Sequence, residues 1–82
     1  MTKFDGRNCK PGMIKYAKYL GSKADYSTVR EVVVDRRCAR LKTFYGHVPS
    51  FDNRTICWHE SGAGNWFWGQ VHHTREECER MV

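Results

Sequence analysis

The sequence predicts a single α+β domain over residues 1–82, with two N-terminal helices, an antiparallel Trp-rich β-hairpin and a short C-terminal helix. Three observations predict this fold. Apolar residues recur at helical spacing in the first half of the chain. Two segments rich in strand-forming and aromatic residues flank a turn-like stretch over residues 61–65. A helix-capping motif then precedes the last residues. A chain of this length buries only a thin core, so a staple or a partner would help to stabilise it.

The chain is predicted to begin with a flexible, basic arm over residues 1–10, followed by a helix over 11–20. Pro11 suits the first position of a helix, and Gly21 suits the position just after its end. Between them, apolar side chains recur at helical spacing: Met13, Tyr16, Ala17 and Leu20.

A second helix is predicted over residues 27–45. Ser27 or Thr28 can serve as its N-cap, and Gly46 lies where it would end. One stripe of side chains recurs at helical spacing: Val34, Cys38, Leu41 and Tyr45. The alternative is a strand, because the β-branched triplet at 32–34 lowers helix propensity and suits a sheet. The helical interpretation is favoured.

The C-terminal half is predicted to form a hairpin between residues 55–60 and 66–73, after a loop over 46–53. Its expected register places two pairs opposite one another: Cys57 with Gln70, and Thr55 with His72. A short helix should follow, because Thr74 and Glu77 have the spacing of a capping box, and acidic residues suit a helix start.

Positive charge is concentrated in the first half of the chain. Residues 1–46 carry eleven Lys and Arg against four Asp and Glu, whereas residues 47–82 carry three against five. The basic half is suited to phosphates or to an acidic protein surface, and the alternative is a solvated, solubilising face. The sequence contains no secretory signal and no apolar run near 18 residues, so no membrane partner is expected and a cytoplasmic location is.

Two segments of the first half carry a resemblance to helix-turn-helix DNA-binding proteins. These are Ala-Lys-Tyr-Leu-Gly at 17–21 and Ser-Thr-Val-Arg-Glu-Val at 27–32. The resemblance covers about residues 13–34, and the connection after Gly21 is longer than that family usually has. It implies that the second helix enters the major groove and that the C-terminal hairpin acts as the wing of a winged helix. The implied base contacts are Ser27, Thr28 and Arg30. The implied phosphate contacts are Arg36, Arg37, Arg40 and Lys42.

A zinc site is a second hypothesis. Cys57 and His59 share one face of the predicted strand, His72 joins that face in the expected register, and Cys78 could complete a tetrahedral set. The favoured interpretation has no cofactor, because the Cys-x-x-Cys spacing of zinc fingers is absent. A disulfide between Cys57 and Cys78 is a further alternative.

The expected function is binding rather than catalysis. No Ser-His-Asp order, phosphate-binding Gly loop or paired-carboxylate cleft is evident, so no enzyme and no small-molecule substrate are expected. The first hypothesis is a small DNA-binding accessory or regulatory protein of a mobile element such as a phage, with duplex DNA as its partner. The alternative is a protein inhibitor or modulator whose aromatic hairpin docks on a larger target with an acidic surface. The anchors would then be Trp58, Trp66 or Trp68.

Overall fold

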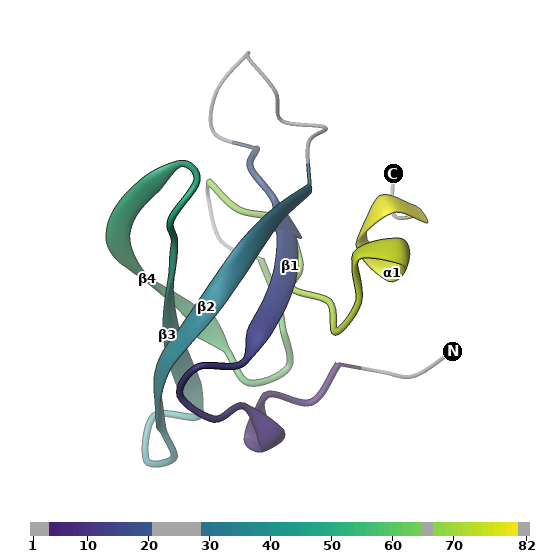
Figure 1. Cartoon of the computed structure of the whole chain (residues 1–82). Helices are drawn as coiled ribbons and strands as arrows, with labels where there is room; N and C mark the ends of the chain where they lie inside the picture. The colour runs from purple at the N-terminus through teal and green to yellow at the C-terminus, as the bar shows by residue number, and fades with distance from the viewer. Residues whose placement is uncertain (1–3, 21–28, 65–66, 81–82) are drawn as a thin grey trace.

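The computed structural model describes residues 4–20, 29–64 and 67–80. Over these residues the chain is a four-stranded antiparallel sheet with one short 3-10 turn and one short helix (Figure 1). The strands lie side by side in chain order, and the sheet is strongly twisted. The elements are η1 (Gly6–Asn8), β1 (Ile14–Lys18), β2 (Val29–Cys38), β3 (Thr43–Val48), β4 (Asp52–His59) and α1 (Arg75–Arg80).

The two predicted N-terminal helices are wrong. Residues 14–18 form β1 in place of the first helix. The helical spacing in this segment arises because β1 is covered on both faces, so apolar residues do not alternate with polar ones. Ala17 is fully buried on the core side. On the other side, the guanidinium of Arg75 from α1 lies 5.4 Å from the ring centre of Tyr16.

The second predicted helix is replaced by β2, a turn and β3. Val32 and Val34 are buried in the core, as the β-branched triplet in the sequence would favour in a strand. The register of β2 against β3 shifts between Val34 and Arg36. This irregularity breaks the alternation of the strand, which is why neither a period of two nor a clean helical period could be recognised over residues 27–45. Gly21, Ser27 and Thr28 lie outside the described residues.

The N-terminal segment, for which the sequence predicted a flexible arm, contributes to the core over its described part. Phe4 and Cys9 are 6% and 4% exposed. Pro11 begins a turn rather than a helix, because the Met13 N–H donates to the Lys10 carbonyl at 3.1 Å and Gly12 has a φ of 91°. Proline followed by a glycine of positive φ is typical of a type II turn.

The predicted hairpin between residues 55–60 and 66–73 is also wrong. β4 pairs with β3, so that Cys57 lies opposite Tyr45. Residues 67–72 instead cross to the far side of the sheet and pair with β1, where His72 lies opposite Tyr16. The Gly69 N–H donates to the Lys18 carbonyl at 2.8 Å, and the His72 N–H donates to the Tyr16 carbonyl, also at 2.8 Å. The sheet is therefore curled, with its last segment returning to its first strand.

The core lies inside this curl and is built largely of aromatic rings. Phe44 and Trp58, which are paired across β3 and β4, stack with ring centres 5.7 Å apart. Trp68 from the returning segment meets Trp58 edge-on at 6.0 Å. Valines fill the remaining space: Val32, Val34, Val48 and Val71.

The predicted C-terminal helix is confirmed. It begins at Arg75, and the Glu77 N–H donates to the Thr74 hydroxyl at 3.2 Å, as the capping motif requires. The helix lies beside β1 and β2 (Figure 1), and Cys78 is buried beneath it. Within the described part of the chain, no helix has the length and apolar character needed to cross a membrane.

We expect Gly46→Ala to destabilise the fold. Gly46 lies in β3 between β2 and β4, and a Cβ there would lie 2.8 Å from the Val33 carbonyl oxygen and 2.9 Å from a methyl carbon of Val32. Such overpacking should lower the free energy of unfolding by about 1–3 kcal/mol, measured by urea denaturation. Gly69→Ala is the matched control, because its nearest neighbours are 3.6 Å away. Equal losses in both variants would contradict this account.

Candidate nucleic-acid interface

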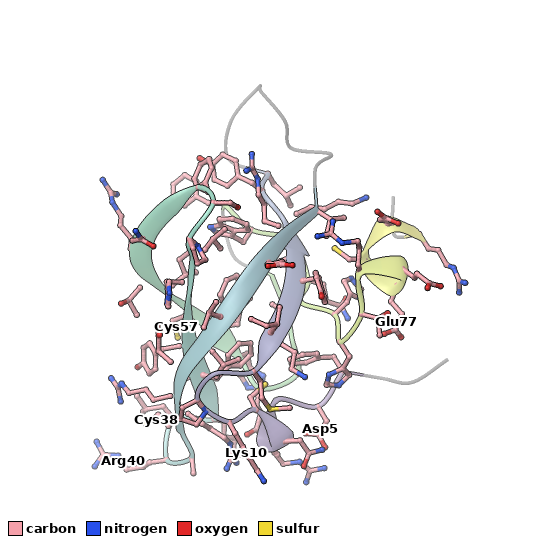
Figure 2. The ribbon with its side chains drawn as sticks, viewed as in Figure 1. Asp5, Lys10, Cys38, Arg40, Cys57 and Glu77 are labelled. Carbon is pink, nitrogen blue, oxygen red and sulfur yellow. The ribbon has the colours of Figure 1, made fainter. Side chains whose placement is uncertain are left out.

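Cationic side chains gather at the end of the molecule formed by η1 and the β2–β3 turn. In Figure 2, Arg40 and Lys10 lie at this end, near Cys38 and Asp5. We call this surface the basic end. Its cations are Arg7, Lys10, Arg36, Arg37, Arg40 and Lys42. Backbone hydrogen bonds hold its parts together. The Gly6 N–H donates to the Glu60 carbonyl, and the Glu60 N–H donates to the Lys42 carbonyl at 2.8 Å.

The β2–β3 turn forms the tip of this end. The last pair of the two strands is Cys38 with Thr43, and residues 39–42 form the turn between them. The Lys42 N–H donates to the Ala39 carbonyl at 3.2 Å. Lys42 has a φ of 56°, a left-handed conformation that residues with a Cβ adopt infrequently. The tip therefore has a defined shape, fixed by bonds within the turn and to the end of β4.

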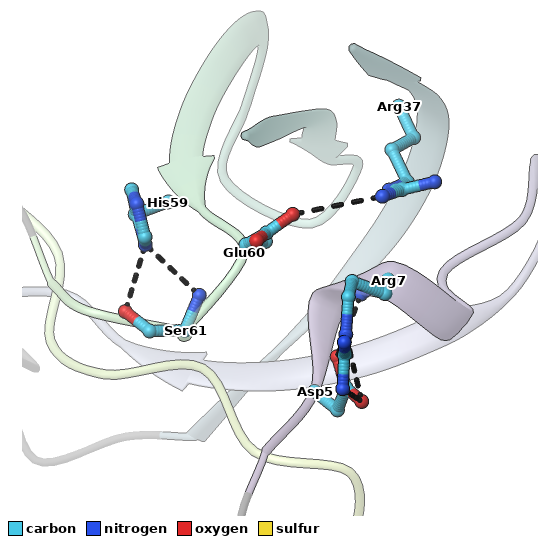
Figure 3. A network of polar contacts seen from close by, with 6 residues as sticks. All are labelled: Asp5, Arg7, Arg37, His59, Glu60 and Ser61. Atoms are coloured by element: carbon cyan, nitrogen blue, oxygen red, sulfur yellow. Dashed lines mark hydrogen bonds and ion pairs between the residues drawn. The ribbon is translucent and has the colours of Figure 1, made fainter. Parts of the chain in front are cut away.

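Two acidic side chains neutralise part of the basic end, as Figure 3 shows. Arg37 pairs with Glu60 at 3.6 Å. Arg7 pairs with Asp5 at 2.9 Å, and the hydrogen bonds from Arg7 lower the pKa of the Asp5 carboxyl to about 2. Asp5 therefore stays ionised at neutral pH, and its charge is matched by Arg7.

The other cations of the basic end are available to a partner. The Arg36 guanidinium lies over the Tyr45 ring, 4.2 Å from its centre, which leaves its charge uncompensated. Among the residues that the structure describes, the side chains of Lys10, Arg40 and Lys42 take part in no ion pair. A cation without a nearby carboxylate contributes its full attraction to an incoming anion, such as a phosphate.

The structure brings together most of the predicted nucleic-acid contacts, but on a different element. The four predicted phosphate contacts, from Arg36 to Lys42, all lie at the basic end, on a β-hairpin rather than on a helix. The recognition mode implied by the helix-turn-helix resemblance is therefore wrong. Arg30 lies apart from them, with its guanidinium 5.3 Å from the centre of the Phe51 ring. Ser27 and Thr28 lie outside the described residues.

Arg7 and Lys10 are the cations that sequence reasoning missed. They precede β1 in a segment with no periodicity, which carries no sequence signal of a fixed position. Their place depends on Phe4 and Cys9, whose burial anchors the segment against the core.

The predicted partner-binding tryptophans are not at the surface. Trp58 is 1% exposed and Trp68 is 4% exposed, so both are part of the core, and Trp66 lies outside the described residues. Exposed apolar side chains are found instead near Tyr19, where β1 ends. Leu20 is 51% exposed, and Phe51 is 44% exposed with its ring centre 4.4 Å from that of Tyr19.

The predicted zinc ligands are not brought together. Cys57 and His59 share the outer face of β4, the sheet face opposite the core, as predicted. His72, however, pairs with β1, and Cys78 lies beneath α1. Among the described residues, no group of three or more His, Cys, Asp and Glu side chains is placed to hold a metal ion. All four cysteines are free thiols in the structure, including Cys57 and Cys78.

A second titratable cluster lies inside the fold, away from the tip. Lys15 is only 6% exposed, and its Nζ lies 3.0 Å from Nδ1 of His73. The Asp5 N–H donates to Nε2 of the same imidazole at 3.3 Å, and the Phe4 ring stacks on it. Burial and the charge of Lys15 lower the pKa of His73, while Glu77 and Asp5 act in the opposite direction. Burial also lowers the pKa of His72.

Comparison with known proteins found no matching protein family, no matching curated protein and no matching solved structure. The function proposed below therefore depends on the geometry and charge of the chain's own residues.

We expect the protein to lose stability on acidification. Because the folded pKa of His73 is lowered, the unfolded chain binds more protons once the pH falls below the ordinary histidine value of about 6.5. The stabilisation is complete above that pH and is lost as the pH falls through the folded pKa. Urea denaturation at pH 7 and pH 5 should show this loss, and it should be smaller in His73→Gln.

His59→Gln is the matched control for this prediction, since His59 is exposed on the outer face of β4 and contacts Ser61. It should leave the difference between pH 7 and pH 5 unchanged. A His73→Gln variant that loses as much stability as the wild type would show that this histidine is not responsible.

Proposed function

We propose that this chain binds duplex DNA through the basic end, as an accessory or regulatory protein rather than an enzyme. The observation that carries the proposal is the tip of the β2–β3 turn. There Arg40 and Lys42 project without ion-pair partners among the described residues, and Lys10 joins them from the neighbouring turn. Three unmatched cations at one end of a domain this small form a compact electrostatic footprint for phosphates.

The shape of the basic end also supports binding to a duplex. A two-stranded β-ribbon is narrow enough to enter a DNA groove, and β2 and β3 form such a ribbon next to the turn. Arg36 and Arg37 stand on the ribbon behind the tip, where they can reach phosphates beside the groove. In this proposal the tip approaches the groove and the arginines behind it contact the backbone.

The charge distribution would orient the protein as it approaches. Glu76 and Glu77 lie on α1, which stands beside β1 and β2 and away from the tip (Figure 1). DNA repels this side of the molecule and attracts the basic end. The resulting electrostatic steering favours encounters in which the tip arrives first.

A second candidate function is docking on a larger protein. The exposed apolar side chains of Leu20 and Phe51 favour it, together with Phe67, which is 55% exposed and accepts a backbone hydrogen bond from the Leu20 N–H. These residues replace the tryptophans as the aromatic and aliphatic anchors of such an interface. Titration of the protein with random-sequence duplex DNA separates the two candidates, because only the first predicts tight, salt-dependent binding to duplex.

We expect duplex binding to weaken steeply with salt, with a slope set by the number of phosphates contacted. Replacing Arg40 by Gln and Lys42 by Asn should reduce the slope of log K against log salt by about 2, because two phosphate contacts are removed. Asn is chosen at position 42 because it tolerates the left-handed conformation found there. Fluorescence anisotropy of a labelled random duplex measures both slopes.

The matched control replaces Arg75 and Arg80 of α1 by Gln, which changes the net charge equally at a different place. Its salt slope should stay that of the wild type. If both double variants reduce the slope equally, binding depends on net charge alone, and the proposed interface is wrong.

A further inference from the structure

Leu41 occupies an unusual place at the apex of the β2–β3 turn. It is 56% exposed, which makes it the most exposed of the large apolar side chains that the structure describes. A single exposed leucine on a protein surface is ordinary. Here, however, it stands between Arg40 and Lys42, whose charges remain unmatched by any described acid. The most exposed point of the basic end is therefore apolar, with a cation on each side.

The turn itself departs from ordinary turn chemistry. Turns of this kind favour Gly, Asn, Asp, Pro and Ser, and residues 39–42, Ala-Arg-Leu-Lys, include none of them. Lys42 adopts the left-handed conformation at a position where glycine would be unstrained. The conformation is held in place by the bond from the Glu60 N–H to the Lys42 carbonyl. This chain thus maintains a strained turn that presents a long aliphatic side chain and two cations outward.

We propose that Leu41 is a wedge that enters between base pairs of duplex DNA from the minor groove and bends the duplex. The proposal rests on the proposed DNA-binding function and specifies how the basic end engages its partner. Proteins that bend DNA this way insert an apolar side chain into a base step while cations hold the adjacent phosphates. The unstacking of one step is offset by the additional phosphate contacts that the bend allows.

The described part of the basic end favours a duplex over a single strand. Single strands are bound by open aromatic faces on which bases stack. In this region Phe44 and Trp58 are buried, and the face of Tyr45 is covered by Arg36. Leu41 therefore offers an aliphatic side chain suited to prising bases apart, and the surrounding rings offer no stacking platform.

The test uses a duplex of about 25 base pairs with a donor and an acceptor dye at its two ends. Anisotropy reports binding, and energy transfer reports bending. Wild-type protein should raise energy transfer on binding, because bending brings the two ends closer together. Leu41→Ala should bind with the salt slope of the wild type and lose this rise. Leu41→Met should keep it, because methionine also serves as a wedge.

A second readout compares a matched duplex with one that carries a single mismatch. Unstacking is less costly at a mismatch, so wild-type protein should bind the mismatched duplex more tightly, and Leu41→Ala should bind both equally. Because Leu41 is exposed, circular dichroism of the variants should match that of the wild type.

The possible results separate the wedge from the function on which it rests. If anisotropy detects no binding to duplex, the DNA-binding function is wrong and the wedge with it. If binding is salt-dependent but energy transfer does not rise, or rises equally in Leu41→Ala, the wedge is wrong and the function stands. Binding to single strands in preference to duplex would likewise overturn the wedge.

Discussion

The pairing of residues 67–72 with β1 is the constraint on which the rest of the structure depends. Without it, β1 would be a sheet edge with unpaired backbone groups. The hydrogen bonds between Gly69 and Lys18, and between His72 and Tyr16, cover that edge. The same return of the chain brings Trp68 against Trp58 inside the curl and delivers α1 to the outer side of β1. One backbone contact therefore sets the core, the helix position and the shape of the sheet.

The basic end depends on the opposite end of the same architecture. There the Glu60 backbone joins three separate segments, since it donates to Lys42 of the β2–β3 turn and accepts from Gly6 of η1. Its side chain also pairs with Arg37. The cations are thus positioned by backbone bonds to a residue at the end of β4, and only one of them is neutralised by that residue's carboxylate. This arrangement gives a rigid surface with charge left for a partner.

The sequence predicted some of this structure for sound physical reasons and missed the rest for equally physical ones. The Thr74 cap is a local signal between neighbouring residues, and it identified α1 correctly. The strands β1 and β2 were mistaken for helices because β1 is covered on both faces and β2 contains a register shift. Both features depend on tertiary contacts that a pattern of residues does not contain.

For the candidate site, sequence reasoning identified most of the cations but not their surroundings. Charge clustering along the chain indicated Arg36 to Lys42, since those residues are neighbours in sequence. Lys10 reaches the same surface through the folded N-terminal segment, which no local signal indicated. The tryptophans were assigned to the surface because the sequence reveals how many rings there are but not how much interior the curled sheet encloses.

The closing contact between His72 and Tyr16 also sets an order of events during translation. β2, β3 and β4 are neighbours in sequence, so they can pair as soon as they emerge from the ribosome. β1 is synthesised first among the strands, yet its outer edge stays open until the segment around His72 has followed. During that interval Phe44 and Trp58 lack the cover of Trp68, and the nascent chain presents an aromatic face of the kind that chaperones recognise.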